Sequence, residues 1–238
     1  MNKYELIKRI EAFAPPQTQE KWDCSGWAVE TVQDNVQKIM LCLTVTENVV
    51  CQAKEQNCDM IISHHPLFCV PVKWCDIDIY CAHTNLDKTR GGTTDTLIEI
   101  IFPHPLRERV QLPEHSEVAN AGEGFVRYVN LDISISDFIE ILKPISPNLR
   151  YVNNSGTKTF KKIAFCAGSG FEFIQEAFEN GADAFVSGDL KFHTALESPI
   201  VLFDIGHFES EVLVLPVFEK LIGRGVEIVY AKEKSPFL

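Results

Sequence analysis

The chain alternates short apolar runs with amphipathic stretches, and this alternation limits the folds that it can adopt. Runs such as "KIMLCLTV" (38–45) and "KKIAFCAG" (161–168) predict buried strands, whereas "ENVVCQAKEQN" (47–57) and "FEFIQEAFENG" (171–181) have helical periodicity. Strands that alternate with helices at this spacing are typical of mostly parallel sheets covered by helices. We therefore predict an α/β fold.

This alternation occurs twice, on either side of a stretch of different composition. Residues 103–125 contain three prolines and mixed charges, which predicts an irregular connection. We predict one domain with two lobes, residues 1–102 and 156–238, joined by a bridge over residues 103–155. An α/β chain of 238 residues can bury a large core within a single domain.

The charge balance restricts the partners of the chain. Its net charge of -11 at pH 7 argues against a nucleic-acid backbone or an anionic membrane as the main partner. Bound divalent cations would offset part of this charge, so the net charge does not argue against an anionic substrate. The opening "MNKYELIKRIEAFAPP" is amphipathic, unlike a signal peptide, and no run reaches the roughly 18 apolar residues of a membrane span. We predict a cytoplasmic protein with no membrane partner.

Eight cysteines are spread over the chain without a C-x-x-C pair. Several of them, such as Cys42 and Cys166, lie in apolar runs that predict strands. Small buried thiols in a reducing compartment explain this pattern. A thiolate zinc site is the alternative, although its paired spacing is absent here.

Side chains that commonly bind metals follow the predicted apolar runs. They are His64, His65, Asp87, His207 and Glu211. In open α/β sheets, ligands collect beyond the carboxyl ends of the parallel strands. These five donors exceed the three that one catalytic zinc usually takes from protein, so we predict two divalent ions in one cleft. Mixed imidazole and carboxylate donors suit zinc, iron or manganese better than calcium or magnesium.

Local geometry gives each donor an expected direction. Neighbouring side chains of an extended chain point apart, and Pro66 favours extended backbone at His65. We therefore expect His64 and His65 to serve different ions, or opposite sides of one cleft. His207 and Glu211 are four residues apart, so a helix there would place them on one face and allow Glu211 to bridge two ions.

Each donor taken alone also has a structural interpretation. A histidine after a strand is often hydrogen-bonded within the fold, and a carboxylate in a first helical turn is favoured by the helix dipole. The metal prediction rests on the joint placement of these residues at the strand ends.

A strand–turn–helix sequence, "CAGSGFE", offers a second candidate site. The backbone N–H groups of Gly168, Ser169 and Gly170 form either a seat for a substrate phosphate or a plain tight turn. Phe173 stands where a dinucleotide fingerprint has its third glycine, which argues against NAD binding.

The remaining histidines have open interpretations. His83, four residues before Asp87, either supports a metal ligand or is simply buried. His193 follows another predicted strand and is either a catalytic proton donor in the cleft or structural. We expect His104 and His115, in the bridge, to be exposed.

Several motifs occur in one order along the chain: "ISHHPLF", "HTNLD…GG", "GSG", "SGD…H" and "DIGHFESE". With them the chain resembles the Nif-three-like family, also labelled GTP cyclohydrolase I type 2 homologues. The resemblance covers essentially the full length, including "KWDCSGW" (21–27), which is similar to the WDNxGL opening of the family.

The resemblance implies the two-lobed α/β fold of that family, assembled as a toroidal homohexamer with dinuclear metal sites facing an internal cavity. Carried over motif by motif, it implies the same five metal ligands that the strand-end argument selects. Cys24, Trp27 and Thr94 depart from the Asn, Leu and Asn that the family commonly has at these places. Residues 103–155 leave little room for the inserted middle domain of longer members, so we expect the fold without it.

We therefore predict a metal-dependent hydrolase of a nucleotide-like or phosphorylated small molecule. The ions would lower the pKa of a bound water and stabilise developing negative charge. GTP ring-opening, the activity that the family label implies, is the most concrete version, with His193 as a proton shuttle. The alternative is a non-catalytic metal-binding or regulatory oligomer. An open coordination position would favour the enzyme, and a saturated site the alternative.

Overall fold

The computed structural model describes residues 1–103 and 124–237, which form two compact units. Unit 1 comprises Met1–Gly92 and Val214–Lys234, and unit 2 comprises Thr93–Leu213 and Ser235–Leu238. Each unit contains a five-stranded sheet flanked by helices, which confirms the predicted α/β class. Among the residues described, we find no helix with the length and apolar character needed to cross a membrane.

The sheet of unit 1 has the strand order β1-β4-β3-β2-β10. These strands are β1 (Gly26–Val29), β4 (Asp78–Cys81), β3 (Met60–Ser63), β2 (Lys38–Cys42) and β10 (Glu227–Tyr230). The β1–β4 pair is antiparallel, and the other neighbours are parallel. The register pairs Cys42 with Ser63 and Ser63 with Cys81, so β2, β3 and β4 end level at one edge.

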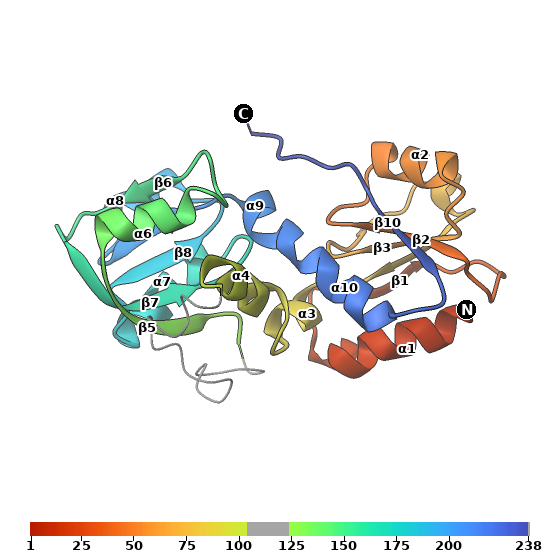
Figure 1. Ribbon diagram of the computed structural model, residues 1–238, viewed down its shortest axis with the longest axis horizontal. Helices are drawn as coiled ribbons and strands as arrows, with labels where there is room; N and C mark the ends of the chain where they lie inside the picture. The colour runs from red at the N-terminus through yellow and green to blue at the C-terminus, as the bar shows by residue number, and fades with distance from the viewer. Residues whose placement is uncertain (104–123, 238) are drawn as a thin grey trace. The chain divides into compact units, whose positions relative to one another are not determined.

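Helices cover both faces of this sheet because its central strands are apolar on both faces (Figure 1). On one face, Val49, Val50 and Ala53 of α2 (Glu47–Glu55) pack against Met40 and Ile61. The helices on the other face are α1 (Lys3–Phe13) and α10 (Leu215–Ile222), which contact each other, and α10 contacts β2. The shorter helical segments are η1 (Pro16–Thr18), η2 (Val72–Trp74) and α3 (Thr84–Lys88).

The sheet of unit 2 has the order β5-β7-β8-β9-β6. Its strands are β5 (Arg127–Ser134), β7 (Thr159–Phe165), β8 (Ala184–Ser187), β9 (Val201–Asp204) and β6 (Arg150–Val152). The central strands β7, β8 and β9 are parallel, whereas the two edge strands are antiparallel to their neighbours. The register aligns Phe165 with Val186 and Val186 with Phe203, so the parallel strands again end at one edge.

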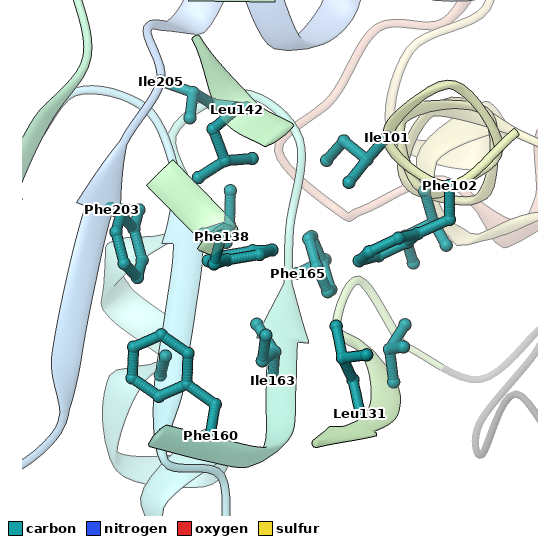
Figure 2. Packing of buried hydrophobic residues seen from close by; sticks show 14 of the residues in the cluster. Ile101, Phe102, Leu131, Phe138, Leu142, Phe160, Ile163, Phe165, Phe203 and Ile205 are labelled. Carbon is teal, nitrogen blue, oxygen red and sulfur yellow. The ribbon is translucent and has the colours of Figure 1, made fainter. Parts of the chain in front are cut away.

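The core of unit 2 is built from aromatic rings (Figure 2). Phe138 of α6 (Ile135–Leu142) meets Phe160 and Phe203 edge to face, with ring centroids 5.9 and 5.1 Å apart. Helix α4 (Thr93–Ile101) packs on the same cluster, and α7 (Ile174–Glu179) packs in the cluster on the other face. The remaining helical segments are η3 (Phe171–Phe173), α8 (Phe192–Glu197), α9 (His207–Glu211) and η4 (Val212–Val214).

The units divide the chain differently from the predicted lobes. The last strand, expected in the lobe of residues 156–238, pairs with β2 in unit 1, with Glu227 beside Lys38. Much of the predicted bridge, residues 103–155, supplies β5, β6 and α6 to unit 2, because buried residues such as Val129 and Leu131 complete its core. The irregular connection with His104 and His115 lies outside the described residues.

The cysteines are buried only in part. The buried ones are Cys42, Cys58, Cys81 and Cys166, and the exposed ones are Cys24, Cys51, Cys69 and Cys75. The expectation of small buried thiols therefore holds for those in and beside the strands. It is wrong for the exposed four, which lie in loops and on the solvent side of α2.

Phe138→Ala tests the packing of unit 2. We expect the free energy of unfolding to fall by about 3–5 kcal/mol, because a cavity replaces a fully buried ring. Phe178→Ala is the matched control, since this ring on α7 is 46% exposed, and it should change the free energy by no more than about 0.5 kcal/mol. Urea denaturation followed by circular dichroism measures both, and equal losses in the two variants would contradict the packing described.

Candidate metal centre

The loop after β3 continues the ladder of unit 1 and fixes the backbone of both adjacent histidines. The backbone N–H of His64 donates to the carbonyl of Cys42 at 3.2 Å, and that of His65 donates to the carbonyl of Leu43 at 2.8 Å. The side chain of His64 is fully buried. The parallel pairing of β2 and β3 therefore positions both imidazoles at the carboxyl edge of the sheet.

One nitrogen of each ring is held by an oxygen of the fold. Nδ1 of His64 lies 3.0 Å from the carbonyl oxygen of Ala82, and Nδ1 of His65 lies 2.7 Å from Oγ1 of Thr44. A carbonyl only accepts, so Nδ1 of His64 carries the hydrogen. Nε2 of His64 then lies 3.3 Å from Oδ1 of Asp87. Histidines that bind metals are commonly fixed in this way through their other nitrogen.

The two rings converge, contrary to the expectation that they point apart. Their centroids are 5.2 Å apart, and both contact the ring of His83. The physical reason is that β3 ends at Ser63, so the alternation of an extended strand does not apply to His64 and His65. Asp87 also differs from expectation, since it lies in α3 rather than directly after β4, which ends at Cys81.

His83 rests on a buried carboxylate. Its Nδ1 lies 3.1 Å from Oδ1 of Asp23, and Oδ2 of Asp23 accepts hydrogen bonds from the hydroxyls of Ser25 and Thr84. Burial raises the pKa of Asp23, but the hydrogen bonds from Thr84, His83 and Ser25 outweigh it and lower the pKa overall. Burial lowers the pKa of His83, and the adjacent His64 adds to this effect. The pair is therefore an ionised carboxylate supporting a neutral imidazole.

In unit 2, α9 begins at His207 directly after β9 and presents a histidine and a carboxylate on one face. Nε2 of His207 lies 2.8 Å from Oε2 of Glu211, which confirms the predicted helical pairing. Nδ1 of His207 lies 2.7 Å from Oδ2 of Asp189, in the turn after β8. Burial lowers the pKa of His207, but the hydrogen bonds and charges of Glu211 and Asp189 outweigh it and raise the pKa to about 9.

The Gly-Ser-Gly turn packs against Glu211. A Cβ atom on Gly168 would lie 2.0 Å from Oε1 of Glu211, so only glycine leaves room for this carboxylate. The N–H groups of Gly168 and Gly170 donate to the hydroxyls of Ser210 and Ser187 at 2.9 and 2.7 Å. These bonds favour the tight turn over a phosphate seat, since two of the proposed N–H donors are used within the fold.

The predicted ligands are divided between the units. His64, His65 and Asp87 belong to unit 1, and His207 and Glu211 belong to unit 2. Their assignment to one dinuclear centre stays a prediction from the sequence. The proposed proton donor, His193, is exposed on α8 beside the ring of Phe192.

Three anchoring residues were not predicted: Asp23, Thr44 and Asp189. Asp23 and Asp189 lie inside the motifs "KWDCSGW" and "SGD", and this position is the sequence feature that could have identified them. Thr44 belongs to none of the motifs. Imidazole and carboxylate donors with fixed orientation suit a zinc-like ion.

Known proteins are similar to this chain in sequence and in fold. A family model described as Duf34/NIF3 (NGG1p interacting factor 3) matches residues 1–236. A Clostridium perfringens protein named GTP cyclohydrolase 1 type 2 homolog is 33% identical over 259 residues, covering 98% of this chain and 97% of its own. The Drosophila melanogaster NIF3-like protein 1 is 30% identical over 216 residues, covering 81% of this chain and 70% of its own.

Solved structures with a similar fold are also known. Reduced HcgD from Methanocaldococcus jannaschii has a TM-score of 0.81 at 27% identity, with 98% of each chain covered. A Bacillus cereus protein related to NIF3 has a TM-score of 0.79 at 19% identity, covering 100% of this chain and 99% of its own, and shows the fold alone.

The environment of His207 predicts its titration in protein stripped of metal. A raised pKa means that the imidazolium stabilises the fold fully below pH 6.5, and that this contribution is lost as the pH rises through about 9. NMR titration of the ring should give a pKa well above 6.5. Asp189→Asn and Glu211→Gln should each lower it, because each removes one hydrogen-bonded negative charge. A ring that titrates near 6.5 in all three proteins would contradict this electrostatic arrangement.

Proposed function

This chain belongs to the Duf34/NIF3 family, and on that premise we propose that it is a dinuclear metal-binding protein that hydrolyses a nucleotide-like small molecule. One observation carries the proposal. In both units, imidazoles beyond the carboxyl ends of parallel strands have Nδ1 held by an oxygen, as His65 is by Thr44 and His207 by Asp189. This arrangement orients Nε2 for a metal ion.

The ions would be held by the five residues that both the strand-end argument and the resemblance select. They are His64, His65, Asp87, His207 and Glu211. When bound, zinc, iron or manganese would supply Lewis acidity, which lowers the pKa of water and stabilises negative charge. This chemistry suits hydrolysis at neutral pH.

The residues of the chain itself would hold the donors in the required state. The carbonyl of Ala82 fixes the tautomer of His64, and Thr44 fixes the orientation of His65. Gly168 leaves the space that the carboxylate of Glu211 occupies. The imidazoles of His64 and His65 are therefore ordered before an ion arrives, which reduces the entropy cost of binding.

The substrate class is proposed from similarity. The Clostridium perfringens relative carries the name GTP cyclohydrolase 1 type 2 homolog, so GTP ring-opening is the first reaction to test. The acidic chain, with a net charge of -11, would need its bound cations to accept an anionic nucleotide. We also propose, from the family resemblance, that the chain assembles as a toroidal homohexamer in the cytoplasm.

Metal content tests the assignment of ligands. Protein purified without chelator should carry about two divalent ions per chain. His64→Ala and His207→Ala should each lower this stoichiometry, because each removes one donor, while circular dichroism stays unchanged. His193→Ala is the matched control, since it removes an exposed imidazole. Inductively coupled plasma mass spectrometry measures the ions, and wild-type content in both ligand variants would refute the assignment.

Catalysis is tested with GTP and then with a panel of phosphoesters. Glu211→Gln should lower turnover by about 10–100-fold or more, because a charged donor is lost. Removal of the ions by a chelator should lower turnover as well. Glu209→Gln, the same change in the same helix, should retain activity. His193→Ala should leave measurable turnover, since a proton shuttle contributes about 10²–10⁴-fold. If Glu211→Gln and chelated protein match wild type on every substrate that is turned over, the metal is not catalytic, and the alternative of a metal-binding or regulatory oligomer replaces the metal-dependent hydrolase.

A further inference from the structure

We propose that His83 is a third imidazole ligand, and that it forms with His64 and His65 a cation site contained entirely in unit 1. The proposal deepens the metal-binding function proposed above by adding a donor. It requires no residue of unit 2, so the two proposals can fail separately.

The spacing of the three rings is the first observation. Their centroids are 5.2, 5.3 and 5.7 Å apart. A zinc ion lies about 2.0–2.1 Å from an imidazole nitrogen, which puts each ring centre about 3.2 Å from the ion and tetrahedral neighbours about 5.2 Å apart. The triangle of rings therefore already has nearly the dimensions of a three-histidine zinc site.

The orientation of the rings is the second observation. One ligand atom of each ring lies within 4.8 Å of the other two. The three Nδ1 atoms are each held by an oxygen of the fold: the Ala82 carbonyl, Thr44 Oγ1 and Asp23 Oδ1. Nε2 is consequently the nitrogen that each ring offers to a shared ion.

The carboxylate behind His83 is the third observation. Asp23 accepts from the backbone N–H of Cys24 at 2.7 Å, from Ser25 Oγ at 2.8 Å and from Thr84 Oγ1 at 2.6 Å. These bonds fix the carboxylate before it meets His83. A fixed carboxylate behind an imidazole is a recurrent support of zinc-bound histidine, because it sets the tautomer and increases the basicity of the ligand.

The chemistry of the donors selects the ion. Three imidazole nitrogens favour Zn²⁺ or Co²⁺ over Mg²⁺ or Ca²⁺, which prefer oxygen ligands. Asp87, 3.3 Å from Nε2 of His64, is the carboxylate within reach of the same ion. Three imidazoles leave one position of a tetrahedral ion, and Asp87 would complete the shell.

The experiment uses the full chain with the donors of unit 2 removed by His207→Ala and Glu211→Gln. Zn²⁺ affinity is measured by competition with a chromophoric chelator, and Co²⁺ by its visible absorption. This double variant should still bind about one ion. Adding His83→Ala should weaken Zn²⁺ binding by at least about 100-fold and change the Co²⁺ spectrum, whereas adding Asp23→Asn should weaken it by about 10–100-fold. Adding His193→Ala should change neither measurement.

Unchanged Zn²⁺ affinity and an unchanged Co²⁺ spectrum after His83→Ala would overturn the proposal. His83→Gln is the second variant, and thermal denaturation in the presence of chelator shows which variants fold. Loss of all binding in the His207→Ala, Glu211→Gln protein would also overturn it, while supporting the five-ligand centre. If the His207→Ala, Glu211→Gln protein retains one ion and loses it after His83→Ala, the three-histidine site is supported. This holds even if the wild-type protein has no hydrolase activity.

Discussion

The register of the parallel strands is the constraint on which both parts of the candidate site depend. In unit 1 it pairs Cys42, Ser63 and Cys81 at the ends of β2, β3 and β4. Thr44, the two adjacent histidines and His83 follow these residues within two positions and so reach one edge. A slip of one residue would turn the side chains of a strand to the opposite face. The central strands are buried on both faces, so such a slip would exchange closely packed side chains for others of different size and shape, and the packing of the core opposes it.

The two units prepare their imidazoles differently. In unit 1, burial and the neighbouring His64 lower the pKa of His83 and outweigh the opposite effects of Asp87 and Asp23. In unit 2, two carboxylates flank His207 and raise its pKa to about 9. A cation reaching His207 must therefore displace a proton, whereas one reaching His83 meets a ring that is already neutral. Metal binding in unit 2 is thus coupled to pH, because protons and cations compete for the same nitrogen.

Much of the fold was predictable because strand and helix periodicities are local properties of the sequence. The strand predicted in residues 38–45 and the helix predicted in residues 47–57 occur as β2 and α2. The division of the chain into two units was not predictable in this way, because β10 pairs with β2, nearly 190 positions away in the chain. Pairing over such a distance depends on which sheet edge is open, and periodicity within one segment contains no information on this.

The candidate ligands were predictable from residue type and position after a strand, but their surroundings were not. The sequence places His83 and Asp87 four residues apart, yet nothing in it shows that a helical turn begins between them and brings the imidazole to His64. The oxygen that anchors His65 comes from Thr44, which no motif marks. Such anchors decide the chemistry, since an imidazole whose Nδ1 is held has one orientation and one tautomer. Whether a histidine can bind a metal therefore depends on a second residue that anchors its ring, and only the three-dimensional structure shows that anchor.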